Sequence, residues 1–263
     1  MRATLLSCSI KKVECVLLLK GIPYKSVEVP NVMPRPDLSE RLGVTYRRIP
    51  VLAVGNDRRF PSSEGYGTLF PRRKGGCTLD SGLIKVFAMF YTDRVIFPLV
   101  KEFLPWAKLP EHFCFQKVID VHDLTNKLPG IKSALASHLG LLEEQLADGR
   151  EWWLTRMQGH LASLKKISTS PEKISGEDTA KLIFSSPSED CDIIGFDEIE
   201  AGRLQLARDD VVSVAPSDYG RTPTVGKVLA LNREEIVIET RGTGGKVHCH
   251  FPRLNFTVAG PKV

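Results

Sequence analysis

The chain has 263 residues, of which 42% are hydrophobic, and a formal net charge of +5. This length suits one to two domains with cores of their own. Six cysteines are scattered without CxxC or zinc-ligand spacing, no secretory leader opens the sequence, and no apolar run approaches the length of a membrane span. We therefore expect a cytoplasmic protein with free thiols and no membrane partner.

The charge is uneven along the chain. Residues from Glu172 onward contain 15 acids and 11 bases, a net charge of −4, so the preceding residues carry a net charge of +9. A basic front half suits small anionic ligands or, less readily, nucleic acid. Because no basic helix, aromatic RNA-binding motif or zinc finger accompanies the charge, we expect no nucleic-acid partner.

The first 57 residues alternate short strands and helices. The expected elements are a strand at 3–6, a helix from Ser7-Cys8-Ser9 to Gly21, a strand at 24–29, a helical turn at 38–42 and a strand at 51–54. Serine is a good residue for a helix start, and glycine suits a helix end. This order indicates a thioredoxin-like beginning, with a proline before the last strand.

That proline, Pro50, has no N–H, so it fits only the first residue or the edge of a strand. The bond before a proline can be cis at modest cost. A cis Ile49–Pro50 bond would turn the backbone of Ile49 outward, toward a peptide-like ligand. The alternative is an ordinary loop proline before an edge strand.

Four motifs in this segment follow one another at consistent spacing. They are Lys12-Val13, Leu17-Leu18-Leu19-Lys20-Gly21-Ile22-Pro23-Tyr24, Val32-Met33-Pro34-Arg35-Pro36-Asp37-Leu38 and Leu42-Gly43-Val44-Thr45-Tyr46-Arg47-Arg48-Ile49-Pro50-Val51-Leu52. Together they resemble the amino-terminal domain of fungal glutathione S-transferase-like proteins. The resemblance implies a thioredoxin-like domain with a cis proline, in which Ile49 and Pro50 form the floor of a glutathione site.

The same segment contains two catalytic candidates and one further binding candidate. Ser7 aligns with the serine that would donate to the glutathione thiolate, and Cys8, where the family usually has proline, is the alternative as an activated thiol. Arg47 would hold a carboxylate of the tripeptide through a bidentate contact. The plainer alternatives remain open: Ser7 and Ser9 only cap the helix, and Arg47 is a solvated arginine.

The chemistry explains why such residues are needed. A thiol with a pKa of about 8.5 is only a few per cent thiolate at neutral pH. Each unit by which the pKa falls corresponds to about 1.4 kcal/mol of preferential thiolate stabilisation. A hydroxyl donor at a helix N-terminus can supply it, because free N–H groups and the helix dipole both favour an anion.

The sequence departs from the family after Asp57. The family has a further strand and an acidic-Ser turn there, which hold the γ-glutamyl end of glutathione. Here Arg58 follows at once, and Ser62, Ser63 and Glu64 are flanked by proline and glycine. We therefore expect an incomplete thioredoxin-like domain at residues 1–64, shortened by a deletion or a gene-model error.

Residues 65–170 show helical periodicity and resemble the all-helical second domain of glutathione transferases. An apolar helix face begins near residue 81, and a second helix is expected at 131–146. Only a helical stub at 161–167 follows, so this domain is also expected to be incomplete and marginally stable. A hydrophobic substrate would lie against three aromatic side chains, Phe87, Phe90 and Tyr91. Alternatively, aromatic residues here form the core of a helix bundle.

Residues 171–263 change to short alternating strands and glycine turns, which indicate a small β-barrel. The expected strands are 180–185, 192–194, 211–214, 227–231, 236–240, 246–250 and 255–258, with one helix at 197–206. The segment resembles the carboxyl-terminal module attached to these fungal proteins. His248-Cys249-His250 suggests a metal site, but in a strand Cys249 faces away from both histidines and no third ligand is near, so we expect no metal.

The expected fold class is α+β and multidomain: a truncated thioredoxin-like domain, a short all-α middle domain and a small β-barrel. The resemblance implies conjugation of glutathione, as co-substrate, to hydrophobic electrophilic small molecules in detoxification or secondary metabolism, and it allows a homodimer. The alternative is a non-catalytic remnant that acts as a binding or scaffold protein through its β-barrel module.

Overall fold

A computed structural model describes most of the chain. The described residues are 8–30, 33–46, 48, 50–55, 57–58, 85–103, 121–146, 153–188, 190–217 and 221–260. The chain divides into two compact units: Met1–Ser62 together with Thr169–Val263, and Ser63–Ser168. The first unit therefore contains both ends of the chain. The division of the sequence at residues 64 and 170 into three domains stays a prediction.

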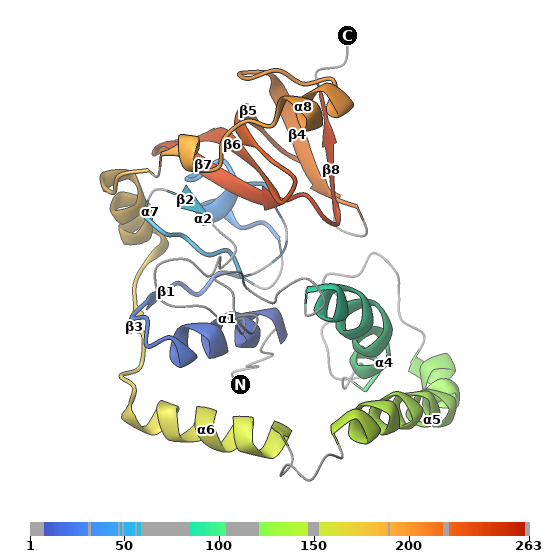
Figure 1. Ribbon diagram of the computed structural model, residues 1–263. Coiled ribbons are helices and arrows are strands. Elements are labelled where there is room, and N and C mark those ends of the chain that lie inside the picture. The colour runs from blue at the N-terminus through green and yellow to red at the C-terminus, as the bar shows by residue number, and fades with distance from the viewer. Residues whose placement is uncertain are drawn as a thin grey trace, which may run out of the picture. The chain divides into compact units, whose positions relative to one another are not determined.

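The first unit is built on an open six-stranded sheet with the order β2-β7-β6-β5-β4-β8 (Figure 1). Its strands are β2 (Asp57–Arg58), β4 (Val211–Pro216), β5 (Thr224–Leu231), β6 (Glu235–Gly242), β7 (Gly245–Pro252) and β8 (Phe256–Ala259). Neighbours are antiparallel except β2, which is parallel to β7. The predicted β-barrel is therefore wrong. Alternation within each strand predicts strands and their faces, whereas closure depends on pairing between the edges, and here β2 and β8 end the order.

Five predicted strands are confirmed as β4 to β8, and the predicted helix at 197–206 is confirmed as α8 (Glu198–Leu204). Two predicted strands are wrong. Residues 180–185 belong to helix α7 (Gly176–Ser185), and residues 192–194 overlap the 3-10 turn η3 (Cys191–Ile193). An apolar run of five or six residues does not distinguish a buried strand from a short helix, so flanking residues must decide.

The flanking residues of α7 favour a helix. The Ser175 hydroxyl accepts a hydrogen bond from the Asp178 N–H at 3.0 Å and so caps the helix start. Ala180 and Ile183, three residues apart, are buried on one helix face. The carboxylate of Glu177, in the first turn, binds the Lys181 ammonium one turn further along the helix. This contact lowers the pKa of the Glu177 carboxyl below its ordinary value.

The amino-terminal segment contributes α1 (Cys8–Leu19), β1 (Lys25–Ser26) and α2 (Pro36–Ser39). Helix α1 ends as predicted before Gly21, whose φ of +63° is left-handed. Strand β1 is parallel to β3 (Glu172–Lys173) of the carboxyl-terminal segment. The predicted strand at 51–54 is reduced to an isolated bridge at Val54. The described strands of this segment therefore pair with strands from the other end of the chain.

The second unit contains η1 (Phe87–Ile96), which is π-helical, α4 (Phe97–Lys101), α5 (Val121–Leu146) and α6 (Trp153–Ile167). The helices predicted at 81–99 and 131–146 are thus present where the structure describes them. Leu124, at 9% exposure, is the one fully buried hydrophobic side chain among the described residues of this unit. Within the described part of the chain, no helix has the length and apolar character needed to cross a membrane.

The core of the first unit joins side chains from both ends of the chain. Buried residues of the sheet pack against buried residues of the amino-terminal segment, which are Leu42, Val44 and Tyr46. The Tyr46 ring lies edge-on to Phe251, with centroids 6.1 Å apart, and 5.9 Å from Phe256. Burial of these apolar side chains is the main favourable term that holds the two segments together.

Backbone contacts reinforce this packing. The Thr243 N–H donates to the Glu40 carbonyl at 2.9 Å, and the Thr240 hydroxyl donates to the Leu42 carbonyl at 3.4 Å. The backbones of these two segments approach so closely that a Cβ on Gly43 would overlap the Arg241 carbonyl. Gly43 also has φ +66°, where other residues are strained. Glycine is therefore required here both by space and by backbone conformation.

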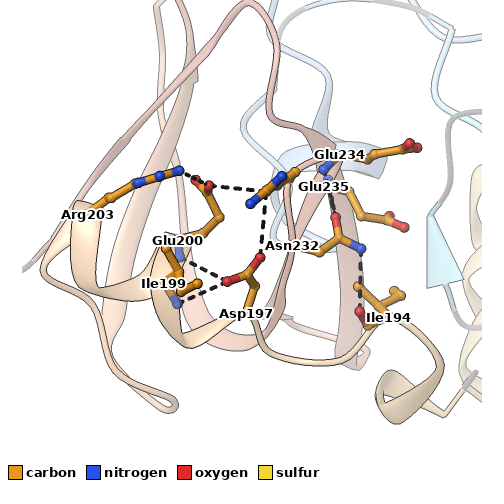
Figure 2. A network of polar contacts seen from close by, with 9 residues as sticks. Ile194, Asp197, Ile199, Glu200, Arg203, Asn232, Glu234 and Glu235 are labelled. Carbon is orange, nitrogen blue, oxygen red and sulfur yellow. Dashed lines mark hydrogen bonds and ion pairs between the residues drawn. The ribbon is translucent and has the colours of Figure 1, made fainter. Parts of the chain in front are cut away.

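A polar network fixes helix α8 against the sheet (Figure 2). The Asp197 carboxylate accepts hydrogen bonds from the N–H groups of Ile199 and Glu200, at 3.0 and 3.1 Å, and so caps the helix. Nε of Arg233, in the turn between β5 and β6, lies 3.7 Å from the Glu200 carboxylate. Arg203 binds the same carboxylate at 2.5 Å. Glu200 therefore connects its own helix to the sheet.

Gly43→Ala is expected to lower the free energy of unfolding of the first unit by about 1 to 3 kcal/mol, because alanine is strained at this φ and overlaps Arg241. Hydrogen exchange of peptides from β6 and β7 measures this change in the first unit itself. The matched control is Gly202→Ala in α8, where a Cβ meets nothing within 4 Å and should add about 0.5 to 1 kcal/mol. Equal protection in the two variants would contradict the close approach.

Candidate functional site

Of the two predicted catalytic residues, Cys8 begins α1, and only its backbone is described. Ser7 lies outside the described residues. The first turn of α1 contains no acidic residue of its own, so no side chain within that turn offsets its N–H groups and dipole. This end of α1 therefore favours an anion such as a thiolate.

The other end of α1 is anchored by burial and by its cap. Leu17 is 6% exposed, and its carbonyl accepts from the Ile22 N–H at 2.9 Å. The Gly21 N–H donates to the Leu18 carbonyl at 3.1 Å. Beyond this cap, burial and then the Glu14 carboxylate raise the pKa of Tyr24 above its ordinary value. The Tyr24 hydroxyl therefore keeps its proton at neutral pH.

Pro50 is the described member of the predicted glutathione-binding set. Arg47 and Ile49 lie outside the described residues, and so does the Ile49–Pro50 bond; the cis bond that the structure describes is Met33–Pro34. Pro50 is half-buried. Tyr46 lies in the core of the sheet and Val51 packs against the same core. The chain is therefore anchored on both sides of residues 47–50.

A buried arginine that the sequence analysis did not single out fixes the loop before α2. Arg35 is 2% exposed, and its Nε donates to the Pro30 carbonyl at 2.7 Å. The Arg35 carbonyl accepts from the Ser39 hydroxyl at 3.1 Å. The sequence feature that could have pointed to Arg35 is its place between two prolines in the motif from Val32 to Leu38. Ser62, Ser63 and Glu64, which stand where the family resemblance implies an acidic-Ser turn, lie outside the described residues.

The three aromatic residues predicted to contact a hydrophobic substrate share η1. Phe87 and Tyr91 stack with centroids 5.2 Å apart, and Phe90 is 60% exposed. The Tyr91 hydroxyl lies 3.0 Å from Nδ1 of His138 on α5, and the two rings meet edge-on at 5.6 Å. The structure thus brings Phe87 and Tyr91 together as part of a helix contact. His138 was missed, although its spacing from Leu135 and Leu142 places it on the inner helix face.

An open groove of about 360 Å³ lies between α4 and α5 in the same unit. Its apolar lining comes from Leu99, Leu124 and Ile131, and charged side chains such as Lys127 also line it. The three predicted aromatic residues do not line it. An apolar ligand of the helical unit therefore has two separate candidate surfaces.

The side chains of His248-Cys249-His250 have different partners. His248 lies near Cys191, and Nδ1 of His250 is 3.0 Å from the Glu235 carboxylate. Cys249 is buried on the opposite face, 3.5 Å from the Thr240 hydroxyl. Within the described ranges, no three His, Cys, Asp or Glu side chains are grouped to hold a metal.

Comparison with known proteins gives a likeness among solved structures. No family model matches the chain, and no curated protein matches it. Among solved structures, the fold is similar to that of a GST-like protein from Pseudomonas syringae, with a TM-score of 0.68 and 19% sequence identity. The match covers 97% of this chain and 96% of that one, so the carboxyl-terminal sheet lies within it. The chain therefore has a GST-like fold.

Tyr91→Phe is expected to destabilise the helical unit by about 0.5 to 1.5 kcal/mol, because the hydroxyl contact with His138 is lost while the ring packing remains. All three tryptophans lie in this unit, so urea denaturation followed by tryptophan fluorescence reports on it alone. Phe90→Leu, at an exposed position of the same helix, is the control and should change little. If the effects of Tyr91→Phe and His138→Ala on the free energy of unfolding simply add in the double variant, the two side chains are not coupled.

Proposed function

We propose that the protein is a glutathione S-transferase-like enzyme that conjugates glutathione to hydrophobic electrophiles. The observation that carries the proposal is the GST-like fold over 97% of the chain. The motifs of the first 57 residues support it, and so does the start of α1 at Cys8, directly after the serine that the family resemblance makes catalytic.

In the proposed reaction, the glutathione thiolate binds at the start of α1. Ser7 donates a hydrogen bond to the sulfur, and the helix N-terminus adds to the stabilisation of its charge. The sulfur then attacks an electrophilic carbon with its electron pair, and the leaving group departs with the electrons of the broken bond. Cys8 is the alternative catalytic residue, as a thiol activated by the same helix end.

The remaining predicted residues bind the two substrates. The backbone of Ile49, turned outward before Pro50, pairs with the cysteinyl part of glutathione, and Arg47 binds a carboxylate. Phe90, which is exposed, offers apolar surface to the electrophile beside the stacked Phe87 and Tyr91. The activity would serve detoxification or secondary metabolism in the cytoplasm, and the family resemblance allows a homodimer.

A non-catalytic role is the second candidate, and one observation favours it. The described strands of the amino-terminal segment pair with the carboxyl-terminal segment: β1 with β3, and β2 with β7. In a scaffold or binding protein, the amino-terminal segment would serve mainly to complete the first unit. Glutathione binding separates this candidate from the enzyme.

Ser7→Ala is expected to lower kcat/KM for 1-chloro-2,4-dinitrobenzene about 100-fold, because the thiolate loses its hydroxyl donor. Glutathione binding, measured by calorimetry at millimolar concentration, should remain. The matched control is Ser9→Ala, two residues further into the helix, which should leave kcat/KM unchanged. Absence of glutathione binding by the wild-type chain would contradict the proposal of an enzyme. Binding without conjugation would favour the non-catalytic role.

A further inference from the structure

A cysteine and a histidine that are far apart in the sequence meet on the sheet of the first unit. Sγ of Cys191, at the start of η3, lies 3.9 Å from Nδ1 of His248 on β7. Both residues are half-buried, so each keeps part of its surface in contact with solvent. Neither residue belongs to the proposed glutathione site, so this contact is independent of that function.

The position of η3 is fixed by contacts with the sheet. The Asn232 amide donates to the Ile194 carbonyl at 3.4 Å (Figure 2), and the Leu231 N–H donates to the Gly195 carbonyl at 3.1 Å. The Asn232 side chain is itself held, because its oxygen accepts from the N–H groups of the two glutamates that follow Arg233, both at 2.8 Å. Cys191 is therefore presented to His248 by a turn attached to the β5–β6 connection.

The position of His248 follows from the alternation along β7. Val247 and Cys249 are buried in the core, so His248 points from the opposite face of the sheet. It pairs in register with Glu239 of β6, whose carboxylate binds Lys246 at 2.8 Å. The strand pairing therefore fixes the backbone of His248 and places its imidazole beside the thiol.

The pair has the composition that activates a thiol. An imidazole within hydrogen-bond reach of a cysteine can accept its proton and leave a thiolate, which is the nucleophilic form. Cys15 is also half-buried, but no described histidine side chain contacts it. Cys249 is buried at 2% exposure. Cys191 is therefore the described cysteine best placed to react.

We propose that Cys191 and His248 form a thiol-modification site, at which Cys191 reacts with small disulfides to form a mixed disulfide. The imidazole of His248 accepts the thiol proton, and the Cys191 thiolate attacks one sulfur of the small disulfide. A new S–S bond forms and the original S–S bond breaks. The departing thiolate takes the electron pair and is protonated by the imidazolium. Cys191 is oxidised, and the departing half of the small disulfide is reduced to a thiol.

Several charged groups surround the pair and enter its pH dependence. Asp190 and Asp192 flank Cys191 in the sequence, and the backbone of Asp57 in β2 pairs in register with that of His248. Besides these, Glu239 and Lys246 lie beside His248 on β6 and β7, and His250 shares its face. A nearby imidazolium offsets the acidic groups, which would otherwise disfavour the thiolate.

The test is the rate of mixed-disulfide formation at each cysteine of the full-length chain. The protein is incubated with 2-hydroxyethyl disulfide, an uncharged probe, between pH 6 and 9, and peptide mass spectrometry follows each site. At pH 7 Cys191 should react at least about 10-fold faster than Cys15 and Cys249. A rate at Cys191 equal to that at Cys15 would overturn the proposal.

The role of the imidazole is tested with His248→Gln. The rate at Cys191 should fall about 10-fold at pH 7, and its pH midpoint should rise toward the ordinary thiol value of about 8.5. His160→Gln, on an exposed face of α6, is the matched control and should change neither quantity. An unchanged rate and midpoint in His248→Gln would overturn the proposal.

Discussion

The contact of residues 40–46 with the hairpin of β6 and β7 is the constraint on which the first unit depends. Gly43 and Gly242 leave no room for a side chain, so the two backbones meet directly. The contact closes a loop of about three quarters of the chain, since Thr240 and Leu42 are 198 of its 263 residues apart. Loop closure of this length must precede the burial that rewards it, so we expect the amino-terminal segment to reach its folded state late.

The same constraint connects the carboxyl-terminal sheet with the proposed glutathione site. Tyr46 lies in the core against Phe251 and Phe256, and Val51 packs against that core. Residues between them include Arg47, Ile49 and Pro50, for which we propose glutathione binding. The sheet therefore supports both ends of the segment that carries the proposed site.

Local sequence patterns predicted most individual helices and strands. They did not predict which strands, far apart in the sequence, pair with one another. The alternation in β4 to β8 and the glycine that follows α1 were sufficient to predict these elements correctly. The helix α7 was missed because its apolar run from Ala180 to Phe184 fits a short strand, although the Ser175 cap was visible. The open sheet could not be predicted, because closure depends on which edges pair. The contact of Cys191 with His248 spans 57 residues and has no local signature.

The two faces of the sheet separate the two proposals. Along β7, Val247, Cys249 and Phe251 point into the core that supports the proposed glutathione site, whereas His248 faces Cys191 on the opposite side. A group attached to Cys191 therefore occupies space outside the core and displaces none of the residues that anchor Tyr46. Cys249 differs, since it is 2% exposed and contacts Thr240, so any attachment there requires the core to open. Modification of Cys191 should for this reason leave the fold intact, and the chemistry of each face can be measured while the other is unchanged.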